Sequence, residues 1–276
     1  MKVWLVTGAS RGLGRSIAEA AARSGDRVMA TARRPEQLTD LVAAYPGRVE
    51  TVALDVTDPA ASERAVRAAV AAFGRLDIVV NNAGYADSAP IEEMSAEEFR
   101  AQIDANLFGV VNVTRAALPV LRGQRSGVFV QISSIGGRVG GTPGMGAYQT
   151  AKFAVEGFSE VLASETEPFG VKVVIVEPGA FRTEWQGSSM VRHRVGPDYE
   201  ATVGRIHRFR DETHGTQQGD PDRAGEAIVR VVSLEDPPRR LPLGSDALAA
   251  ALTAGAARNA EAEKWADLSR STDFAA

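Results

Sequence analysis

KVWLVTGASRGLG, residues 2–14, decides the fold, because a short apolar run leads directly into a loop with glycines at positions 8, 12 and 14. Apolar runs rich in β-branched residues favour buried strands, and glycines let the backbone turn sharply and approach a ligand closely. Such a loop at the start of a helix can hold a pyrophosphate on free N–H groups. The spacing is GxxxGxG, which differs from the commoner GxGxxG fingerprint and lacks the lysine of a Walker loop. Taken alone, the stretch also fits a plain turn between a strand and a helix.

Strand-like and helix-like stretches alternate along the chain. Further apolar runs predict strands at residues 27–31, 49–54, 76–80, 127–132 and 171–176. Apolar residues at helical spacing predict helices at residues 15–24, 59–73, 95–121 and 147–166. Strands that are apolar throughout are buried on both faces. We therefore expect an α/β fold, a single domain over residues 1–276, doubly wound, with a mostly parallel sheet between two helix layers. Ligands of such folds bind at the carboxyl ends of the strands.

Two regions depart from this alternation. Residues from about 182 to 222 are polar and turn-rich without clear periodicity, which predicts a mobile substrate-binding loop or, alternatively, a plain surface excursion. Trp185, Met190 and Tyr199 in this region could line a pocket or cap the core. A helix near 222–233, a short apolar run at 241–245 and an Ala-rich helix follow. The C-terminal extension, about 237–276, could cover the pocket or join an interface.

Composition argues against several classes of function. The formal net charge is −4 with mixed signs along the chain, so we expect neither nucleic acid nor a membrane surface as a partner. Absence of cysteine excludes disulfides, thiolate nucleophiles and cysteine metal clusters, and it fits the cytoplasm. No segment approaches the roughly 20 apolar residues that span a bilayer, and the N-terminal apolar run is too short for a signal peptide. His193, His207 and His214 lack zinc-site spacing, so we expect surface histidines and no metal.

The end of the second predicted strand indicates the nucleotide. NAD sites usually place an acid about 20 residues beyond the glycines to hold the ribose 2′-hydroxyl, whereas MATARRP supplies Arg33 and Arg34 here. Guanidinium groups suit a 2′-phosphate, and Arg11 in the glycine loop could bracket the same group. The sequence therefore predicts NADP(H) in preference to NAD(H). Alternatively these arginines, Arg34 above all, only solvate the start of a helix.

AYQTAKFAVEGF, residues 147–158, places a phenol and an amine four residues apart in helix-forming sequence. Side chains at this spacing lie on one face of a helix, about 6 Å apart. A phenol with a pKa near 10 is a poor base, but the Lys152 ammonium and an oxidised nicotinamide would lower the pKa of Tyr148. Tyr148 could then act as a general acid in reduction or a general base in oxidation. In isolation, such a pair is more often a chance arrangement on a helix surface.

Five motifs together resemble the short-chain dehydrogenase/reductase family. TGASRGLG, NNAG (81–84), the serines of ISSIGG (132–137), YQTAK (148–152) and PGAFRT (178–183) occur in its order and approximate spacing, and the resemblance covers roughly residues 2–235. It implies a Rossmann-type fold, a nicotinamide cofactor and the catalytic set Asn106, Ser134, Tyr148 and Lys152. It further implies a cofactor site formed by Gly8, Ser10, Arg11, Gly12, Leu13, Gly14, Arg33, Asp55, Val56, Asn82, Ala83, Gly84, Tyr148, Lys152, Pro178, Gly179 and Thr183.

The resemblance also implies roles. Asp55 would lie near adenine, Asn82 near ribose, and Lys152 would hold the nicotinamide ribose hydroxyls. Adjacent side chains at a strand end face opposite ways, and the family pattern selects Ser134, not Ser133, to stabilise the substrate oxygen. Ser134 lies 14 positions before Tyr148, one more than in many members, which suggests an insertion in the loop between them.

Asn106 needs a separate reason, because asparagine is a poor helix former and lies here in the middle of a predicted helix. The resemblance implies that Asn106 holds a water connecting Lys152 to solvent in a proton relay. The alternative is an asparagine packed against neighbouring backbone.

Taken together, the sequence predicts a cytoplasmic NADP(H)-dependent carbonyl reductase or alcohol dehydrogenase that acts on a small-molecule ketone, aldehyde or secondary alcohol. The family resemblance adds a homodimer or homotetramer formed through the long helices at about 96–122 and 147–168. Two alternatives remain open: an isomerase or dehydratase with the same Tyr-Lys pair, and an NADP-binding sensor without turnover. The sequence does not specify the natural substrate.

Overall fold

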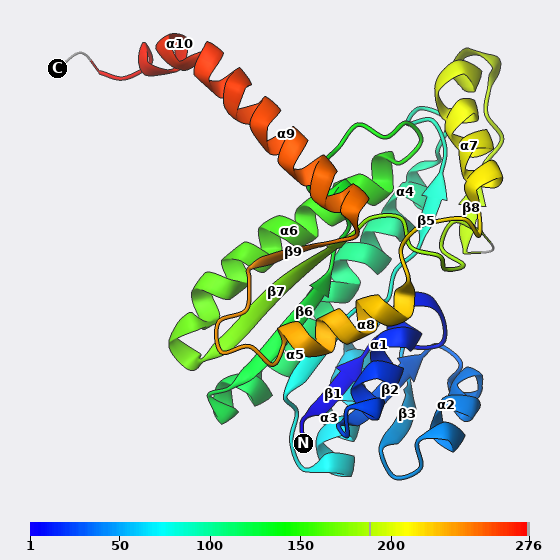
Figure 1. The fold of residues 1–276 in the computed structure, drawn as a ribbon, viewed down its shortest axis with the longest axis vertical. Helices are drawn as coiled ribbons and strands as arrows, with labels where there is room; N and C mark the ends of the chain where they lie inside the picture. The colour runs from blue at the N-terminus through cyan, green and yellow to red at the C-terminus, as the bar shows by residue number, and fades with distance from the viewer. Residues whose placement is uncertain (188, 275–276) are drawn as a thin grey trace.

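A seven-stranded sheet forms the centre of the computed structural model, which describes residues 1–187 and 189–274 (Figure 1). The strand order is β3-β2-β1-β4-β6-β7-β9, and each neighbouring pair is parallel. The strands are β1 Val3–Val6, β2 Arg27–Ala32, β3 Val49–Ala53, β4 Ile78–Asn81, β6 Gly127–Ile132, β7 Val171–Pro178 and β9 Arg240–Leu243. The chain winds outward in both directions from β1 and β4, which confirms the predicted doubly wound α/β fold.

Two helix layers bury the apolar strands. The layer nearer the viewer in Figure 1 has α1 Gly12–Arg23, α2 Thr39–Ala44 and α8 Pro221–Val231, and the other has α3 Pro59–Phe73, α5 Gly109–Gln124 and α6 Gly146–Thr166, with α4 Ala96–Ile103 beside α6. Successive residues of β1 point to opposite faces. Trp4 therefore packs with Ile17 and Ile228 in one core, while Leu5 packs with Val113 in the other.

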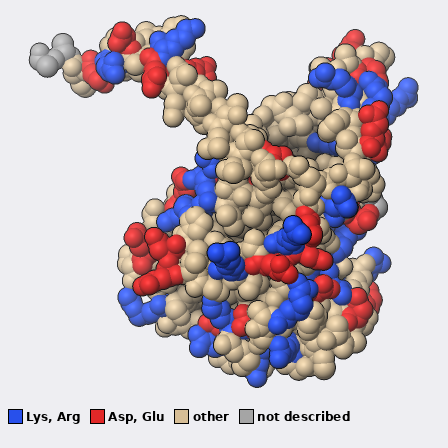
Figure 2. Space-filling model, in the orientation of Figure 1, with Lys and Arg blue, Asp and Glu red and all other residues tan. Residues whose placement is uncertain are grey.

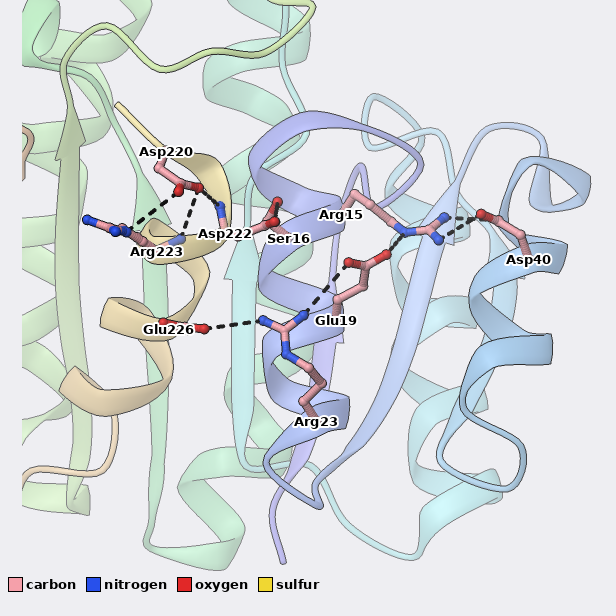
Figure 3. Close-up of polar contacts among 9 residues, drawn as sticks. All are labelled: Arg15, Ser16, Glu19, Arg23, Asp40, Asp220, Asp222, Arg223 and Glu226. Carbon is pink, nitrogen blue, oxygen red and sulfur yellow. Dashed lines mark hydrogen bonds and ion pairs between the residues drawn. The ribbon is translucent and has the colours of Figure 1, made fainter. Parts of the chain in front are cut away.

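Helix α1, which follows the glycine loop, is held against α8 at close range (Figure 3). A Cβ atom at Gly225 would lie 2.5 Å from the backbone oxygen of Ser16, so only glycine permits this approach. The Ser16 hydroxyl donates to Asp222 Oδ1 at 2.8 Å, and Arg23 lies 3.6 Å from Glu226 Oε1. A helix from late in the chain thus fixes the position of the glycine loop.

The region predicted as a mobile loop without periodicity, residues 182–222, contains regular structure; its residue 188 lies outside the described residues. Strand β8 (Met190–Arg192) pairs with β5 (Ala86–Ser88) in a second, two-stranded parallel sheet, and a π-helical turn, Glu200–Gly204, leads into α7 (Arg205–Thr213). The expectation of an irregular segment is therefore wrong. Helix α7 reads RIHRFRDET, in which few apolar residues mark the helical period, and β8 has only 3 residues.

The C-terminal extension, about 237–276, divides into two parts, and its residues 275–276 lie outside the described residues. Its start supplies β9, an edge strand, where Pro242 is tolerated because one side of the strand needs no hydrogen bonds. Helices α9 (Ser245–Lys264) and α10 (Ala266–Arg270) then project away from the body (Figure 1). Among the described helices, none combines the length and apolarity that crossing a bilayer requires. Acidic and basic side chains are interspersed on the face shown in Figure 2.

Candidate active site

A cavity of about 990 Å³ lies at the carboxyl ends of the strands and brings the predicted residues together. Its lining includes every predicted catalytic and cofactor residue except Gly14, namely Gly8, Ser10, Arg11, Gly12, Leu13, Arg33, Asp55, Val56, Asn82, Ala83, Gly84, Asn106, Ser134, Tyr148, Lys152, Pro178, Gly179 and Thr183. Gly14 lies behind the loop, where a Cβ atom would be 2.4 Å from the backbone oxygen of Gly8. Its role in this structure is close packing beneath the cradle.

The glycine loop has the backbone geometry that its sequence predicts. Gly8 and Gly12 adopt φ of +64° and +57°, in the left-handed region that favours glycine. The Asn82 side chain donates to the backbone oxygens of Thr7 and Gly8 at 2.9 and 3.1 Å, which ties the turn after β4 to the glycine loop. Asn82 thus shapes the cradle, and its contact with ribose stays a prediction.

Arginines gather at the end of the cavity beside the glycine loop and β2. Arg11, Arg33 and Arg34 are exposed and line the cavity, and no described acid forms an ion pair with any of them. Arg34 therefore lies at the cavity together with Arg33. Asp55 lines the same cavity, and its Oδ1 accepts hydrogen bonds from Thr57 N–H at 3.0 Å and from the Thr57 hydroxyl at 2.7 Å.

Tyr148 and Lys152 lie on one face of α6, as predicted, and both are buried. Lys152 Nζ lies 5.7 Å from the centroid of the Tyr148 ring and donates to the backbone oxygen of Ile132 at 2.8 Å. The Trp185 ring packs against Tyr148 with centroids 5.3 Å apart. The phenol is therefore held between α6 and the segment after β7, at the wall of the cavity.

Burial shifts the pKa of both members of this pair. Burial raises the pKa of Tyr148 to about 12, while the Ser134 hydroxyl and then Arg210 act in the opposite direction. Burial lowers the pKa of Lys152 to about 8, opposed by the negative charge of Glu156. In the protein alone, loss of hydration disfavours the phenolate more than the Ser134 hydroxyl and Arg210 favour it. The lowering of the Tyr148 pKa by Lys152 together with an oxidised nicotinamide stays a prediction.

The two serines after β6 have different surroundings. Ser134 Oγ accepts a hydrogen bond from Gly136 N–H at 3.0 Å and lies close enough to Tyr148 to lower the pKa of the phenol. Ser133 is 2% exposed, and its hydroxyl has no hydrogen-bond partner among the described residues. Both line the cavity, and the interaction with Tyr148 favours Ser134 as the functional hydroxyl.

Asn106 lies in a π-helical turn, Asp104–Phe108, between α4 and α5. Its Nδ2 donates to the backbone oxygens of Tyr85 and Gln102, both at 2.9 Å, and its Oδ1 accepts from Tyr85 N–H at 3.2 Å. This geometry is that of the alternative in which asparagine packs against neighbouring backbone. The water relay implied by the family stays a prediction.

One residue that supports the site, Asp246, was not predicted from the sequence. Asp246, at the start of α9, accepts a hydrogen bond from Ala180 N–H at 2.7 Å, and a Cβ atom at Gly179 would lie 2.4 Å from its carboxylate. The C-terminal extension therefore fixes the Pro-Gly turn after β7, while its distal end projects away. The only sequence signal was an acid in the first turn of a predicted helix.

The sequence left open whether Trp185, Met190 and Tyr199 line a pocket or cap the core, and the structure places each of them differently. Trp185 lines the cavity, Met190 is buried in a cluster with Tyr148, and the Tyr199 hydroxyl donates to Glu92 at 2.7 Å without lining the cavity.

Two of the histidines in this region contact other elements. His193 lies 3.5 Å from Glu98, and His207 Nε2 lies 2.9 Å from the Ser88 hydroxyl. Within the described ranges, no group of His, Cys, Asp and Glu could hold a metal.

Comparisons with known proteins identify the family of this chain. A family model described as short chain dehydrogenase matches residues 2–192. Oxidoreductase BOA17 of Botryotinia fuckeliana is 48% identical over 269 residues, which are 97% of this chain and 98% of that protein. A short-chain dehydrogenase from Streptomyces avermitilis has a crystal structure with a TM-score of 0.92 and 44% identity, covering 99% of this chain and 100% of that one. An alcohol dehydrogenase from the archaeon Thermococcus sibiricus, complexed with 5-hydroxy-NADP, gives a TM-score of 0.73 and 28% identity over 88% of this chain and 96% of that one. The chain therefore belongs to the short-chain dehydrogenase/reductase family and is an oxidoreductase.

Proposed function

We propose that this oxidoreductase transfers hydride between NADP(H) and a ketone, aldehyde or secondary alcohol, with Tyr148 as the general acid or base. The observation that carries the proposal is the buried Tyr148-Lys152 pair in the wall of a cavity that also reaches Arg11, Arg33 and Arg34. Bound nicotinamide supplies the hydride in such chemistry. The protein must orient the two reactants and manage the proton.

Proton transfer follows from the ionisation of the site. With a pKa raised to about 12, Tyr148 is protonated at neutral pH and can donate its proton to the substrate oxygen as a carbonyl is reduced. The Ser134 hydroxyl would stabilise that oxygen as negative charge develops. Lys152, held at the Ile132 carbonyl, would bind the nicotinamide ribose hydroxyls and, when protonated, favour the phenolate in the oxidative direction.

The nucleotide preference rests on the arginines and the glycine cradle. Gly8 and Gly12 let the backbone of the loop approach a pyrophosphate, Gly14 permits the close packing beneath it, and the N-terminus of α1 favours negative charge. Arg33 and Arg34, free of ion pairs with described acids, suit a 2′-phosphate. The Thermococcus sibiricus relative carries an NADP derivative, which agrees with this preference.

Assembly and location are part of the same proposal. Helix α6 and the π-helical turn before α5 expose Phe108, Phe153 and Val161, which are 51%, 40% and 58% accessible. These apolar residues suit the subunit contacts that the family resemblance implies for the same helices. We expect a cytoplasmic homodimer or homotetramer that uses these helices.

The test is the rate of NADPH and, separately, NADH oxidation over aldehydes, ketones, quinones and ketosteroids. The proposal predicts turnover with at least one carbonyl class and a preference for NADPH. Tight NADPH binding without turnover across the panel would contradict the proposal and favour a cofactor sensor.

A further inference from the structure

Arg210, on α7, is a buried cation without a carboxylate. Arg210 is only 7% exposed. Its Nη1 donates hydrogen bonds to the Ser88 hydroxyl at 3.4 Å and to Met190 Sδ at 3.5 Å. Within residues 1–187 and 189–274, no acid forms an ion pair with this guanidinium. Burying a charge against a hydroxyl and a thioether is costly, because neither replaces the hydration that the charge loses.

Other arginines of the chain show the usual arrangement. Arg240 forms ion pairs with Glu156, Glu160 and Glu177. Burial acts to lower the pKa of its guanidinium, but Glu160 and Glu156 outweigh it and the pKa is raised. For Arg210 the direction is opposite, since burial and the nearby Arg192 lower its pKa to about 10. The half-buried Arg240 thus has three carboxylate partners, whereas the buried Arg210 has none among the described residues.

The charged groups around Arg210 leave a net charge of +1. Arg192 pairs with Asp211 and also donates to the Gln186 carbonyl, so this carboxylate is already shared with another guanidinium. His207, on the same helix, touches Ser88, and burial followed by Arg210 and Arg192 lowers its pKa. This shift favours the neutral imidazole. One monoanion would balance the cluster, whereas a dianion would exceed it.

The unbalanced charge lies beside the catalytic phenol. Met190, which contacts Arg210, is buried in one cluster with Tyr148, and Trp185 packs against that cluster. The preceding residue, Ser189, lines the cavity. Arg210 also lies near enough to Tyr148 for its charge to lower the pKa of the phenol. A methionine side chain is flexible and can give way to a ligand.

We infer that Arg210 binds a carboxylate on the substrate, so that the compound reduced is a keto acid and the compound oxidised is the corresponding hydroxy acid. The inference rests on the proposed function and deepens it. Hydride passes from the nicotinamide to the carbonyl carbon, the Tyr148 proton passes to the carbonyl oxygen, and the carboxylate is unchanged. A planar guanidinium matches the two carboxylate oxygens, which an ester or amide does not offer as a charged pair.

The test compares acids with matched neutral probes. The 2-, 3-, 4- and 5-oxo acids of five to eight carbons are assayed with NADPH beside their methyl esters and a phosphate-bearing ketone. The acid that fits best is expected to exceed its ester in kcat/KM by about 10–100-fold, the factor that a hydrogen-bonded charge pair provides. Arg210→Met is expected to bring this ratio close to one, and Arg210→Lys to give an intermediate ratio. Because the ratio is taken within one variant, any effect of Arg210 on Tyr148 cancels.

Arg208→Met is the matched control. Arg208 lies two residues away on the same helix, is exposed and pairs with Glu200, so the ratio is expected to stay at the wild-type value. An ester reduced as well as its acid, a ratio unchanged in Arg210→Met, or a preference for the phosphate-bearing ketone would overturn the inference.

A binding measurement separates this inference from the proposed function. Calorimetry of the NADP⁺ complex with hexanoate and hexanamide needs no turnover. Binding of hexanoate alone, lost in Arg210→Met, would support the carboxylate site even if no compound is reduced and the proposed reaction fails. Equal binding of both probes, or of neither, would overturn the carboxylate site even if neutral ketones are reduced.

Discussion

At the scale of single residues, the site depends on ionisable groups placed out of water. Tyr148 and Lys152 have pKa values shifted toward their neutral forms by burial, to about 12 and about 8. The spacing of the two residues was predictable, because an i, i+4 pair on a helix must share a face. The direction of the Tyr148 shift was not, because burial depends on Trp185 and other residues distant in the sequence.

The buried Lys152 gives stability a specific pH dependence. A lysine with a folded pKa near 8 and an unfolded pKa near 10.5 binds fewer protons when folded between these values, so the free energy of unfolding rises with pH across this window. Relative to Lys152→Met, the wild-type protein should gain about 1–2 kcal/mol between pH 8 and 10. Tyr148 titrates above this range.

Denaturant unfolding at several pH values measures the difference between the two proteins. Parallel pH profiles for wild type and Lys152→Met would show that burial does not lower the pKa of Lys152.

A substitution at Arg33 tests the preference for NADPH over NADH. Arg33→Ala should raise the Kd for NADPH about 10–100-fold, the cost of losing a charged hydrogen-bond partner of the 2′-phosphate, while the Kd for NADH changes little. Arg223→Ala is the control, since that side chain is 86% exposed on α8 and lies outside the cavity lining. Nucleotide fluorescence titration gives both constants. Equal loss for NADPH and NADH would assign Arg33 a structural role instead.

At the scale of elements, the apolar pattern identified six strands of the central sheet and most of the long helices. The strand predictions succeed because strands buried on both faces must be apolar throughout. Helix α7, with its charged sequence, and the three-residue β5 and β8 carry too little pattern to be predicted. The buried cluster that they build behind Tyr148, including Met190 and Arg210, was therefore not predictable.

The contact between α1 and α8 makes a prediction about glycine. Gly225→Ala should destabilise the protein by about 1–3 kcal/mol, because its Cβ would meet the Ser16 backbone at 2.5 Å and push the helices apart. Gly157→Ala, in α6, has no atom within 4 Å of its Cβ and should stabilise by about 0.5–1 kcal/mol through helix propensity. Thermal unfolding of the two variants and the wild-type protein measures both changes in stability. The same sign for both variants would contradict this account of the α1 and α8 contact.

At the scale of the whole molecule, residues far apart in sequence complete the site. Asp246 supports the turn after β7, although it belongs to the extension whose far end projects as α9 and α10 (Figure 1). Sequence reasoning placed the motifs along one sheet edge, since the carboxyl ends of parallel strands meet there. It could not place Asp246, because its position depends on how β9 docks on β7.

Subunit assembly is a prediction at this scale. Val161 is 58% exposed on α6, and Val161→Arg should convert the expected dimer or tetramer to smaller species by burying a charge in the interface. Light scattering with size-exclusion chromatography reports the mass. A wild-type mass near the 29.2 kDa of one chain would contradict the expected assembly.

The central claim is that Tyr148 transfers the proton that accompanies hydride transfer, and Tyr148→Phe tests it most directly. Using the best carbonyl substrate, single-turnover NADPH oxidation and the Kd for NADPH are measured for both proteins. The account predicts a rate lower by about 10²–10⁴-fold, the usual contribution of a general acid, with the Kd for NADPH within a fewfold of wild type. A variant that reduces the substrate at the wild-type rate would contradict the claim.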